Sequence, residues 1–272
     1  MSERIDILLS NFMENSVPAH GLPAVAYNDS EFWKVESETV FTQNWVFVGF
    51  VHELEKPGDV VTCSVAGQPL ILIKNDLGEI NAFHNACRHR CLKLVDEPKN
   101  VGTKLRCPYH SWTYSLDGEL IATSFFAGEG HQVEGFELSE NGLMPARLAI
   151  WHDWIFINLS GEAPEFEQYS APLVKYFHDI NFEKVKAVAT LDFGEISTNW
   201  KFLMENFIEP YHVQFVHRTT TNQPLKDHYT IVDDVCLGSA IDLDEGDLSL
   251  IHISEPTRLL SIAYAGVCLK KK

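Results

Sequence analysis

The sequence predicts an α+β protein in which an all-β unit is followed by a region of mixed helix and strand. Between residues 44 and 160, short apolar runs alternate with a period of two and are separated by turns rich in Gly, Asp and Pro. The composition changes over 160–165, and the segments 171–180 and 199–217 then show helical spacing. A chain of 272 residues is long enough for two such domains.

Short strands and one preceding helix make up the expected β-unit. Asp29 or Ser30 can cap an amphipathic helix over 31–41, which we expect to lie against the β-unit. The strands are expected at 45–50, 59–65, 70–73, 80–84, 112–114, 147–151 and 154–159. Beyond the change in composition, 184–196 is predicted to be a strand or one arm of a hairpin.

The overall charge and composition argue against several classes of protein. The formal net charge is −17, so we do not expect a nucleic-acid partner. The N-terminus lacks the basic start and long apolar core of a secretory signal, and no run reaches the ~18 apolar residues of a membrane span. The six scattered cysteines lack the density of a disulfide framework, which predicts a reducing, cytoplasmic compartment.

Two short motifs supply sulfur and nitrogen donors. One residue separates Cys87 from His89, and two residues separate Cys107 from His110. Two loops of this kind, facing one another, present two thiolates to one metal ion and two imidazoles to another. A [2Fe–2S] cluster needs this donor set when two His replace two Cys on one iron. The alternative is a structural zinc site, although zinc loops usually open with about two to four residues between the first ligands.

The residues around these donors resemble the signature of Rieske domains. The segments 85–90 and 107–114 match that signature residue by residue. The resemblance implies that a [2Fe–2S] cluster is held by Cys87, His89, Cys107 and His110. Cys91 departs from the pattern, because the family usually has Gly there. A fifth sulfur at this place could compete for iron or oxidise, but we expect Cys91 to be a small buried residue.

A second candidate site follows the change in composition. A helix is expected to begin at 197–199, and its wide apolar stripe indicates a buried helix. The polar residues on it are Glu205, Asn206, Glu209 and His212. Pro210 should bend or end this helix, which would let His212 and His217 converge. The alternative is two ordinary core histidines, each with a hydrogen-bond partner.

This stretch is similar to the iron-binding signature of the Rieske non-haem iron oxygenases. The matching residues are Asn199-Trp-Lys, Glu205-Asn, an acid, Tyr211-His and His217, and the similarity covers about residues 25–245. It implies that His212 and His217 are two ligands of a 2-His-1-carboxylate site for mononuclear Fe(II). Glu209 stands where the family usually has Asp, and it is the candidate catalytic residue. In the family this acid hydrogen-bonds a cluster histidine of a neighbouring subunit and carries electrons across the interface.

The resemblance implies the alpha subunit of an oxygenase. Such a component receives electrons from NAD(P)H through a ferredoxin or flavin reductase, passes them from the [2Fe–2S] cluster to Fe(II), and hydroxylates a small organic substrate with O₂. Glu209 and the N-terminal third are similar to the carnitine and choline monooxygenases, so a quaternary ammonium compound is the candidate substrate. The cross-subunit electron path implies a homo-oligomer, commonly a trimer. The alternatives are an aromatic-ring-hydroxylating dioxygenase alpha subunit, a Rieske electron carrier without oxygenase activity, and a zinc-stapled binding module.

The expected organisation has four parts. Residues 1–43 form an N-terminal helical segment, 44–160 the Rieske domain, and 161–247 the start of the catalytic domain. The resemblance implies that this last domain is an incomplete helix-on-antiparallel-sheet fold of the START/Bet v 1-like type. Residues 248–272 resemble a translated sequencing adapter, so we expect them to be a non-native tail.

The family's third iron ligand is an Asp much further along the chain than the second His. This chain ends 55 residues past His217. The carboxylates within that distance lie too early to match, and we expect them to be surface acids: Asp233, Asp234, Asp242 and Asp244. We therefore expect the catalytic domain to be incomplete and the fragment to hold mononuclear iron weakly at best.

Overall fold

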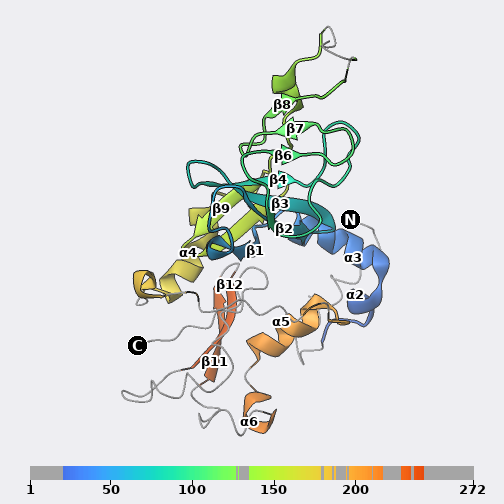
Figure 1. The fold of residues 1–272 in the computed structure, drawn as a ribbon. Coiled ribbons are helices and arrows are strands. Elements are labelled where there is room, and N and C mark those ends of the chain that lie inside the picture. Colours follow the sequence, from blue (N-terminus) through green and yellow to red (C-terminus); the bar gives the residue numbers. More distant parts are fainter. Residues whose placement is uncertain are drawn as a thin grey trace. The chain divides into compact units, whose positions relative to one another are not determined.

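The structure is a computed structural model, and it divides the chain into two compact units (Figure 1). One unit is Phe41–Ala163, and the other combines Met1–Val40 with Pro164–Lys272. The described residues are 21–126, 128, 135–178, 181–185, 187, 194, 196–209, 211–216, 228–233 and 236–241. His217 and the predicted tail 248–272 therefore lie outside the described residues. None of the helices that the structure describes has the length and hydropathy of a membrane span.

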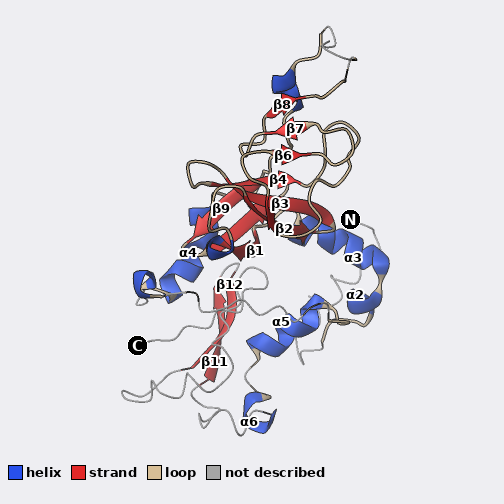
Figure 2. Ribbon diagram, viewed as in Figure 1, coloured by secondary structure: helices blue, strands red, loops and turns tan. Residues whose placement is uncertain are grey.

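The unit of residues 41–163 is built from antiparallel strands (Figure 2). The strands are β1 (Val46–Phe50), β2 (Asp59–Val65), β3 (Gln68–Lys74), β4 (Ile80–His84), β5 (Lys99–Asn100), β6 (Leu105–Arg106), β7 (Thr113–Tyr114), β8 (Leu120–Ala122), β9 (Arg147–Trp151) and β10 (Trp154–Asn158). Short 3₁₀ helices lie at Val51–Glu53 and Leu138–Asn141. The strand orders are β4-β3-β2-β5, β1-β10-β9 and β6-β7-β8.

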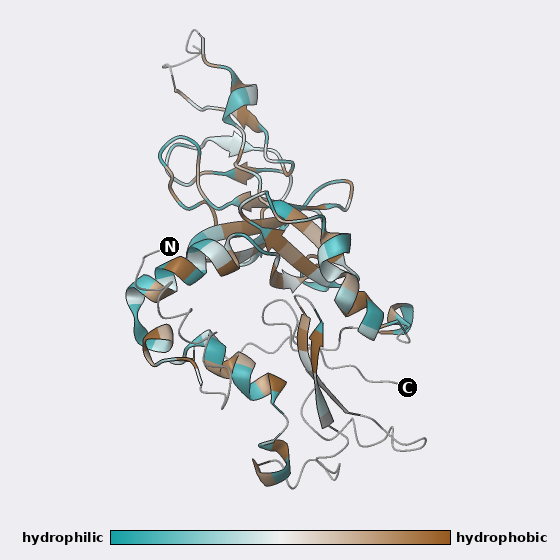
Figure 3. Cartoon of the chain, turned by 180° about the vertical axis from the view of Figure 1, so that it is seen from behind, coloured by the Kyte–Doolittle hydropathy of each residue, from teal (hydrophilic) through white to brown (hydrophobic). Residues whose placement is uncertain are grey.

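Strand β3 is the centre of this unit because both of its faces are buried. Ile71 and Ile73 pack into one hydrophobic core, which also contains Cys87 and Cys107. Leu70 and Leu72, on the opposite face, pack into a second core with β1 and β10. The sheet that contains β2 and β3 is correspondingly hydrophobic over much of its length (Figure 3). The side chains of β3 thus connect the packing of the sheet to the loops that carry the metal donors.

The two ends of this unit lie side by side. Asn158 Nδ2 donates hydrogen bonds to the carbonyl oxygens of Thr42 at 3.3 Å and Asn44 at 3.1 Å. The backbone N–H of Ser160 also donates to the Thr42 carbonyl, at 3.0 Å. The chain therefore enters and leaves the β-unit at neighbouring positions, as expected of a domain inserted between two segments of another unit.

The second unit combines helices with an antiparallel hairpin, so the predicted α+β class is confirmed. Its elements are α2 (Val25–Asn28), α3 (Ser30–Glu36), a π turn (Ser37–Phe41), α4 (Phe166–Tyr176), a 3₁₀ helix (Phe182–Lys184), α5 (Trp200–Ile208), α6 (Val213–Val216), β11 (His228–Asp233) and β12 (Cys236–Ile241). Within the predicted strand 184–196 the described residues are few, and the 3₁₀ helix occupies its first position.

The helix termini follow the capping residues in the sequence. Asp29 caps α3, because its side chain accepts hydrogen bonds from the N–H groups of Glu31 and Phe32. Asn199 caps α5 by accepting from the Lys201 N–H at 3.0 Å. Helix α5 ends at Ile208 and α6 begins at Val213, so the break expected before His212 is confirmed.

The helix expected over 31–41 divides between the two units. Residues 31–40 belong with the C-terminal unit, where Glu36 pairs with Lys201 of α5, and Phe41 belongs with the β-unit and packs on its core. The expectation that helix α5 is buried was wrong. Helix α5 is only half-buried, and Phe202 is half-exposed. Among the described residues, α5 contacts α2, α3 and β12, which cover one of its faces. The prediction made from the wide apolar stripe therefore overestimated how much of this helix is buried.

Candidate functional site

Two loops with the same backbone geometry carry the four donors. In the first, the Cys87 N–H donates to the Leu92 carbonyl at 2.9 Å, and the Cys91 N–H donates back to the Cys87 carbonyl at 2.8 Å. In the second, the Cys107 N–H donates to the Trp112 carbonyl at 2.8 Å, and the Ser111 N–H donates to the Cys107 carbonyl at 3.0 Å. Each cysteine thus begins a closed turn, and the histidine that follows it lies on that turn.

The closing residue of each turn has a left-handed backbone. Cys91 has a φ of 54° and Ser111 a φ of 58°. A side chain in this region is strained, because its Cβ approaches the following carbonyl, whereas glycine is not. Cys91 is exposed and not buried as we expected, since its position in the turn directs it to the surface. The general preference of cysteine for the interior is overridden here by the turn geometry.

The two turns bring the donors together in two pairs. The thiols of Cys87 and Cys107 are both buried and in contact, and the rings of His89 and His110 lie 4.7 Å apart between centroids. Burial raises the pKa of the Cys87 thiol, and the neighbouring Cys107 thiol raises it further. Among the described residues, no three Cys, His, Asp or Glu side chains converge as they would around a single ion. Two sulfurs and two nitrogens suit a binuclear centre, in which each iron takes two protein donors.

His89 provides the sharpest test of whether a metal fits. Its Nδ1 is buried, and within the described part of the chain it has no hydrogen-bond partner. The ring stacks on Trp112 at 4.8 Å and meets Phe126 edge-on at 5.7 Å, so aromatic rings cover it. Burial lowers the pKa of His89, which keeps the imidazole neutral. A buried nitrogen lone pair without a donor is costly, and a bound metal ion would satisfy it.

Two further polar residues hold the first loop through contacts that were not predicted. The buried Asn85 accepts from the N–H groups of Leu94 and Val95, and it donates to the Val95 carbonyl at 2.6 Å. The buried Tyr114 hydroxyl accepts from the Arg88 N–H at 3.0 Å and lies 3.3 Å from the Cys87 Sγ. Both residues lie within the motifs themselves, but spacing alone does not reveal which backbone groups they would satisfy.

The second candidate site is described in part. Glu209 is the C-cap of α5, and its carboxylate contacts both the backbone N–H and the Nδ1 of His212. A carboxylate on one ring nitrogen fixes the tautomer and orientation of an imidazole. His217 lies outside the described residues, so its convergence with His212 stays a prediction. Asp233 accepts from Lys175 Nζ at 2.7 Å and from the Tyr176 hydroxyl at 3.1 Å, which lowers the pKa of its carboxyl.

Two family models match this chain. Residues 44–127 match the Rieske [2Fe-2S] domain, and residues 176–239 match the catalytic domain of the ring-hydroxylating alpha subunit. The chain belongs to the Rieske oxygenases. The first matched range contains both donor turns, and the second contains Glu209, His212 and His217.

Curated relatives of this Rieske oxygenase chain include two enzymes of quaternary ammonium metabolism. The glycine betaine monooxygenase oxygenase subunit of Chromohalobacter salexigens is 35% identical over 215 residues, which cover 79% of this chain and 46% of the relative. The carnitine monooxygenase oxygenase subunit of Escherichia coli K12 is 28% identical over 227 residues, covering 82% of this chain and 59% of the relative. The chain thus spans about half the length of the curated relatives it matches.

Solved structures of Rieske oxygenases are also similar. The quaternary ammonium Rieske monooxygenase CntA, in complex with an inhibitor, matches with a TM-score of 0.70 and 25% identity, covering 84% of this chain and 63% of that one. Naphthalene 1,2-dioxygenase from Rhodococcus sp., bound to indole, matches with a TM-score of 0.77 and 27% identity, covering 90% of this chain and 58% of that one.

The left-handed closing residues lead to a prediction about stability. Cys91→Gly should raise the free energy of unfolding by roughly 1 kcal/mol, because glycine adopts the φ of 54° without strain. Cys91→Ala is the matched control, since it removes the sulfur but keeps the Cβ, and it should bring no gain. Urea unfolding of the metal-free protein measures both. If the alanine variant were as stable as the glycine variant, backbone strain at this position would be excluded.

Proposed function

We propose that this chain provides the Rieske domain, at 44–160, and part of the catalytic domain, at 161–247, of an oxygenase component. In this proposal the component hydroxylates a small organic substrate with O₂, using electrons from NAD(P)H that a ferredoxin or flavin reductase supplies. The observation that carries the proposal is the meeting of two thiols and two imidazoles on twin turns, where the buried Nδ1 of His89 has no hydrogen-bond partner among the described residues.

We assign Cys87 and Cys107 to one iron of a [2Fe–2S] cluster, and His89 and His110 to the other. Such a cluster, when bound, carries one electron at a higher potential than an all-cysteine cluster. The surrounding residues support this assignment. Trp112 covers one face of the His89 ring and keeps water from it. The Tyr114 hydroxyl, which already accepts from Arg88, is free to donate its own proton to the Cys87 sulfur.

The assigned ligands of mononuclear Fe(II) are His212 and His217, and the assigned catalytic residue is Glu209. The contact between the Glu209 carboxylate and His212 Nδ1 supports this proposal, because it leaves Nε2 of the same ring as the donor toward a metal. In a homo-oligomer, for which a trimer is the expected form, Glu209 would also reach a cluster histidine of a neighbouring subunit. That role would make one carboxylate part of both redox sites.

The relatives favour a quaternary ammonium compound as the substrate. The glycine betaine and carnitine monooxygenase oxygenase subunits act on such compounds, as their names state. A second candidate is an aromatic ring, since naphthalene dioxygenases and a salicylate 5-hydroxylase are also among the similar proteins. An electron carrier without oxygenase activity would not need the segment that matches the ring-hydroxylating catalytic domain. A zinc-stapled module would not need two donor pairs arranged for two metal ions.

Electron paramagnetic resonance of the dithionite-reduced protein tests this proposal. A cluster with two Cys and two His ligands gives a lower average g-value than an all-cysteine cluster. The molar amount of acid-labile sulfide should equal the molar amount of cluster iron. Assay of the protein for zinc is the control. A colourless preparation that contains zinc and no labile sulfide would refute the cluster. Electron transfer without substrate oxidation, in a full-length relative, would favour the carrier.

Tyr114→Phe should lower the reduction potential of the cluster. A hydroxyl that donates to a sulfur ligand stabilises the reduced state, and about 1 kcal/mol of hydrogen bonding corresponds to roughly 40 mV for one electron. Tyr109→Phe is the matched control, because Tyr109 packs against His110 but is exposed. Protein-film voltammetry measures both variants. An unchanged potential in Tyr114→Phe, with the cluster retained, would show that the hydroxyl does not act on the sulfur.

A further inference from the structure

A lysine of α5 is buried in the second unit. Lys201 is 6% exposed, and its ammonium lies 2.6 Å and 2.8 Å from the two carboxylate oxygens of Glu36, which is 7% exposed. The two residues are 165 positions apart, so the pair joins α3, before the β-unit, to α5, after it. The Trp200 Nε1 donates to the same carboxylate at 3.4 Å. A buried charge is costly unless it is paired, and each of these two charges depends on the other.

Aromatic rings complete a cage around this ammonium. Lys201 Nζ lies 5.2 Å from the ring of Trp200, 5.4 Å from that of Phe32 and 5.6 Å from that of Tyr27. Aromatic faces and a carboxylate are the groups that recognise alkylammonium ions. The cage is therefore a cation site that the protein's own side chain fills.

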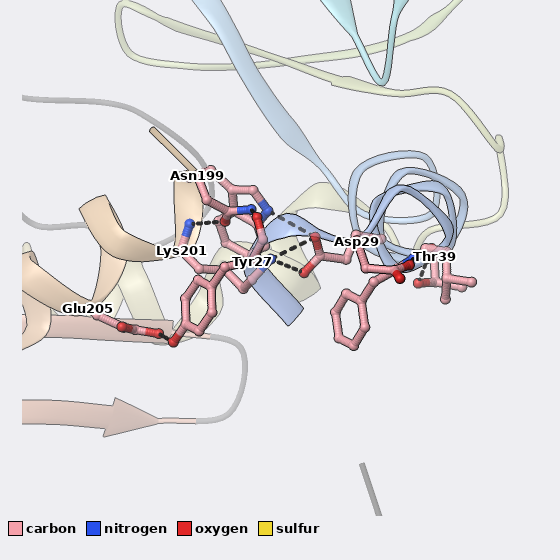
Figure 4. A network of polar contacts seen from close by, with 10 residues as sticks. Tyr27, Asp29, Thr39, Asn199, Lys201 and Glu205 are labelled. Carbon is pink, nitrogen blue, oxygen red and sulfur yellow. Dashed lines mark hydrogen bonds and ion pairs between the residues drawn. The ribbon is translucent and has the colours of Figure 1, made fainter. Parts of the chain in front are cut away.

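Further contacts tie α5 to the same N-terminal segment (Figure 4). The Tyr27 hydroxyl donates to Glu205 Oε1 at 2.5 Å, and Asn199 Nδ2 donates to the Tyr27 carbonyl at 2.8 Å. The ring of Tyr27 stacks on Phe202 at 4.3 Å. Burial raises the pKa of Tyr27 to about 12, so its hydroxyl remains a donor toward Glu205. The contacts extend along the helix from its cap to its sixth residue.

We propose that Lys201 is a positioning residue that holds α5, and through it Glu209 and His212, at a fixed register against residues 27–36. A buried ion pair adds little net stability compared with apolar packing, but it penalises any other register, which would leave both charges buried and unpaired. Glu209 is the C-cap of α5, and its carboxylate accepts a hydrogen bond from the backbone N–H of His212, so the register of the helix sets where these two side chains lie. The inference rests on the proposed function in so far as these residues serve iron.

The test of this positioning role compares the full chain with three variants. Lys201→Met keeps an apolar stem but removes the charge. The double variant Glu36→Gln with Lys201→Met also removes the carboxylate, so no charge is left unpaired. Lys175→Met is the matched control, because Lys175 pairs with Asp233 at 2.7 Å and lies 5.2 Å from the Tyr176 ring, but its side chain is 67% exposed.

Hydrogen exchange of α5 and Co(II) binding, as a spectroscopic stand-in for Fe(II), are the two readouts. In Lys201→Met, exchange over 200–208 should accelerate at least ~10-fold and Co(II) affinity should fall by a similar factor. The g-values of the reduced cluster should stay unchanged, and Lys175→Met should alter neither readout. The double variant should recover the thermal midpoint but not the Co(II) affinity, which distinguishes positioning from stability.

A chemical rescue tests the cage itself. Lys201→Ala opens it, and n-butylammonium should slow the exchange of α5 again, whereas 1-butanol, which has no charge, should not. The positioning role is wrong if the double variant binds Co(II) as the parent does and its α5 exchanges at the parental rate. If the unsubstituted chain binds no Co(II), the cause is its incomplete iron site and not Lys201, and a full-length relative then tests the iron site. The exchange data alone decide the positioning role in that case, since unchanged exchange in Lys201→Met would overturn it.

Discussion

The meeting of two buried thiols and two half-buried imidazoles on twin turns is the constraint on which the β-unit depends. Two buried thiols, and an imidazole nitrogen that has no hydrogen-bond partner among the described residues, would oppose folding if nothing compensated them. Asn85 and Tyr114 satisfy backbone groups of the first loop, and β3 supplies apolar side chains beneath both turns. Within the part of the chain that the structure describes, the buried Nδ1 of His89 is thus left unsatisfied at the place where a metal centre would use it.

The sequence predicted those features that depend on local patterns. The strands β1 to β4, β7, β9 and β10 followed from period-two alternation, whereas β5, β6, β8, β11 and β12 were not predicted. The donor turns followed from the short spacing of Cys and His. The cap at Asn199 and the break after Ile208 followed from residues whose backbone preferences are strong. In each of these cases the cause and the effect lie within a few positions of one another, so that a short window contains the necessary information.

The wrong expectations concern contacts between distant segments or geometry that a residue's average behaviour does not reveal. Helix α3 packs with α5 because of the pair between Glu36 and Lys201, and no periodicity over 31–41 could show which unit that carboxylate faces. The exposure of Cys91 follows from a left-handed turn and contradicts the usual burial of cysteine. The sequence patterns also did not reveal that the β-unit is inserted between two segments of the other unit, because this too depends on contacts between distant segments. The change in composition at 160–165 marks its exit, whereas its entry lies at the end of a continuous helical segment.

The cage around Lys201 also limits where a cationic substrate could bind. Its three aromatic rings and the Glu36 carboxylate are the groups expected around a quaternary ammonium ion, but Lys201 occupies them and its ammonium cannot leave without exposing a buried charge. A substrate cation must therefore use other aromatic or acidic groups. If the proposed quaternary ammonium substrate is correct, the same type of interaction would have two separate roles: an internal one that fixes α5, and an exchangeable one where the substrate binds. The ammonium of Lys201 would then keep the substrate cation out of the internal cage.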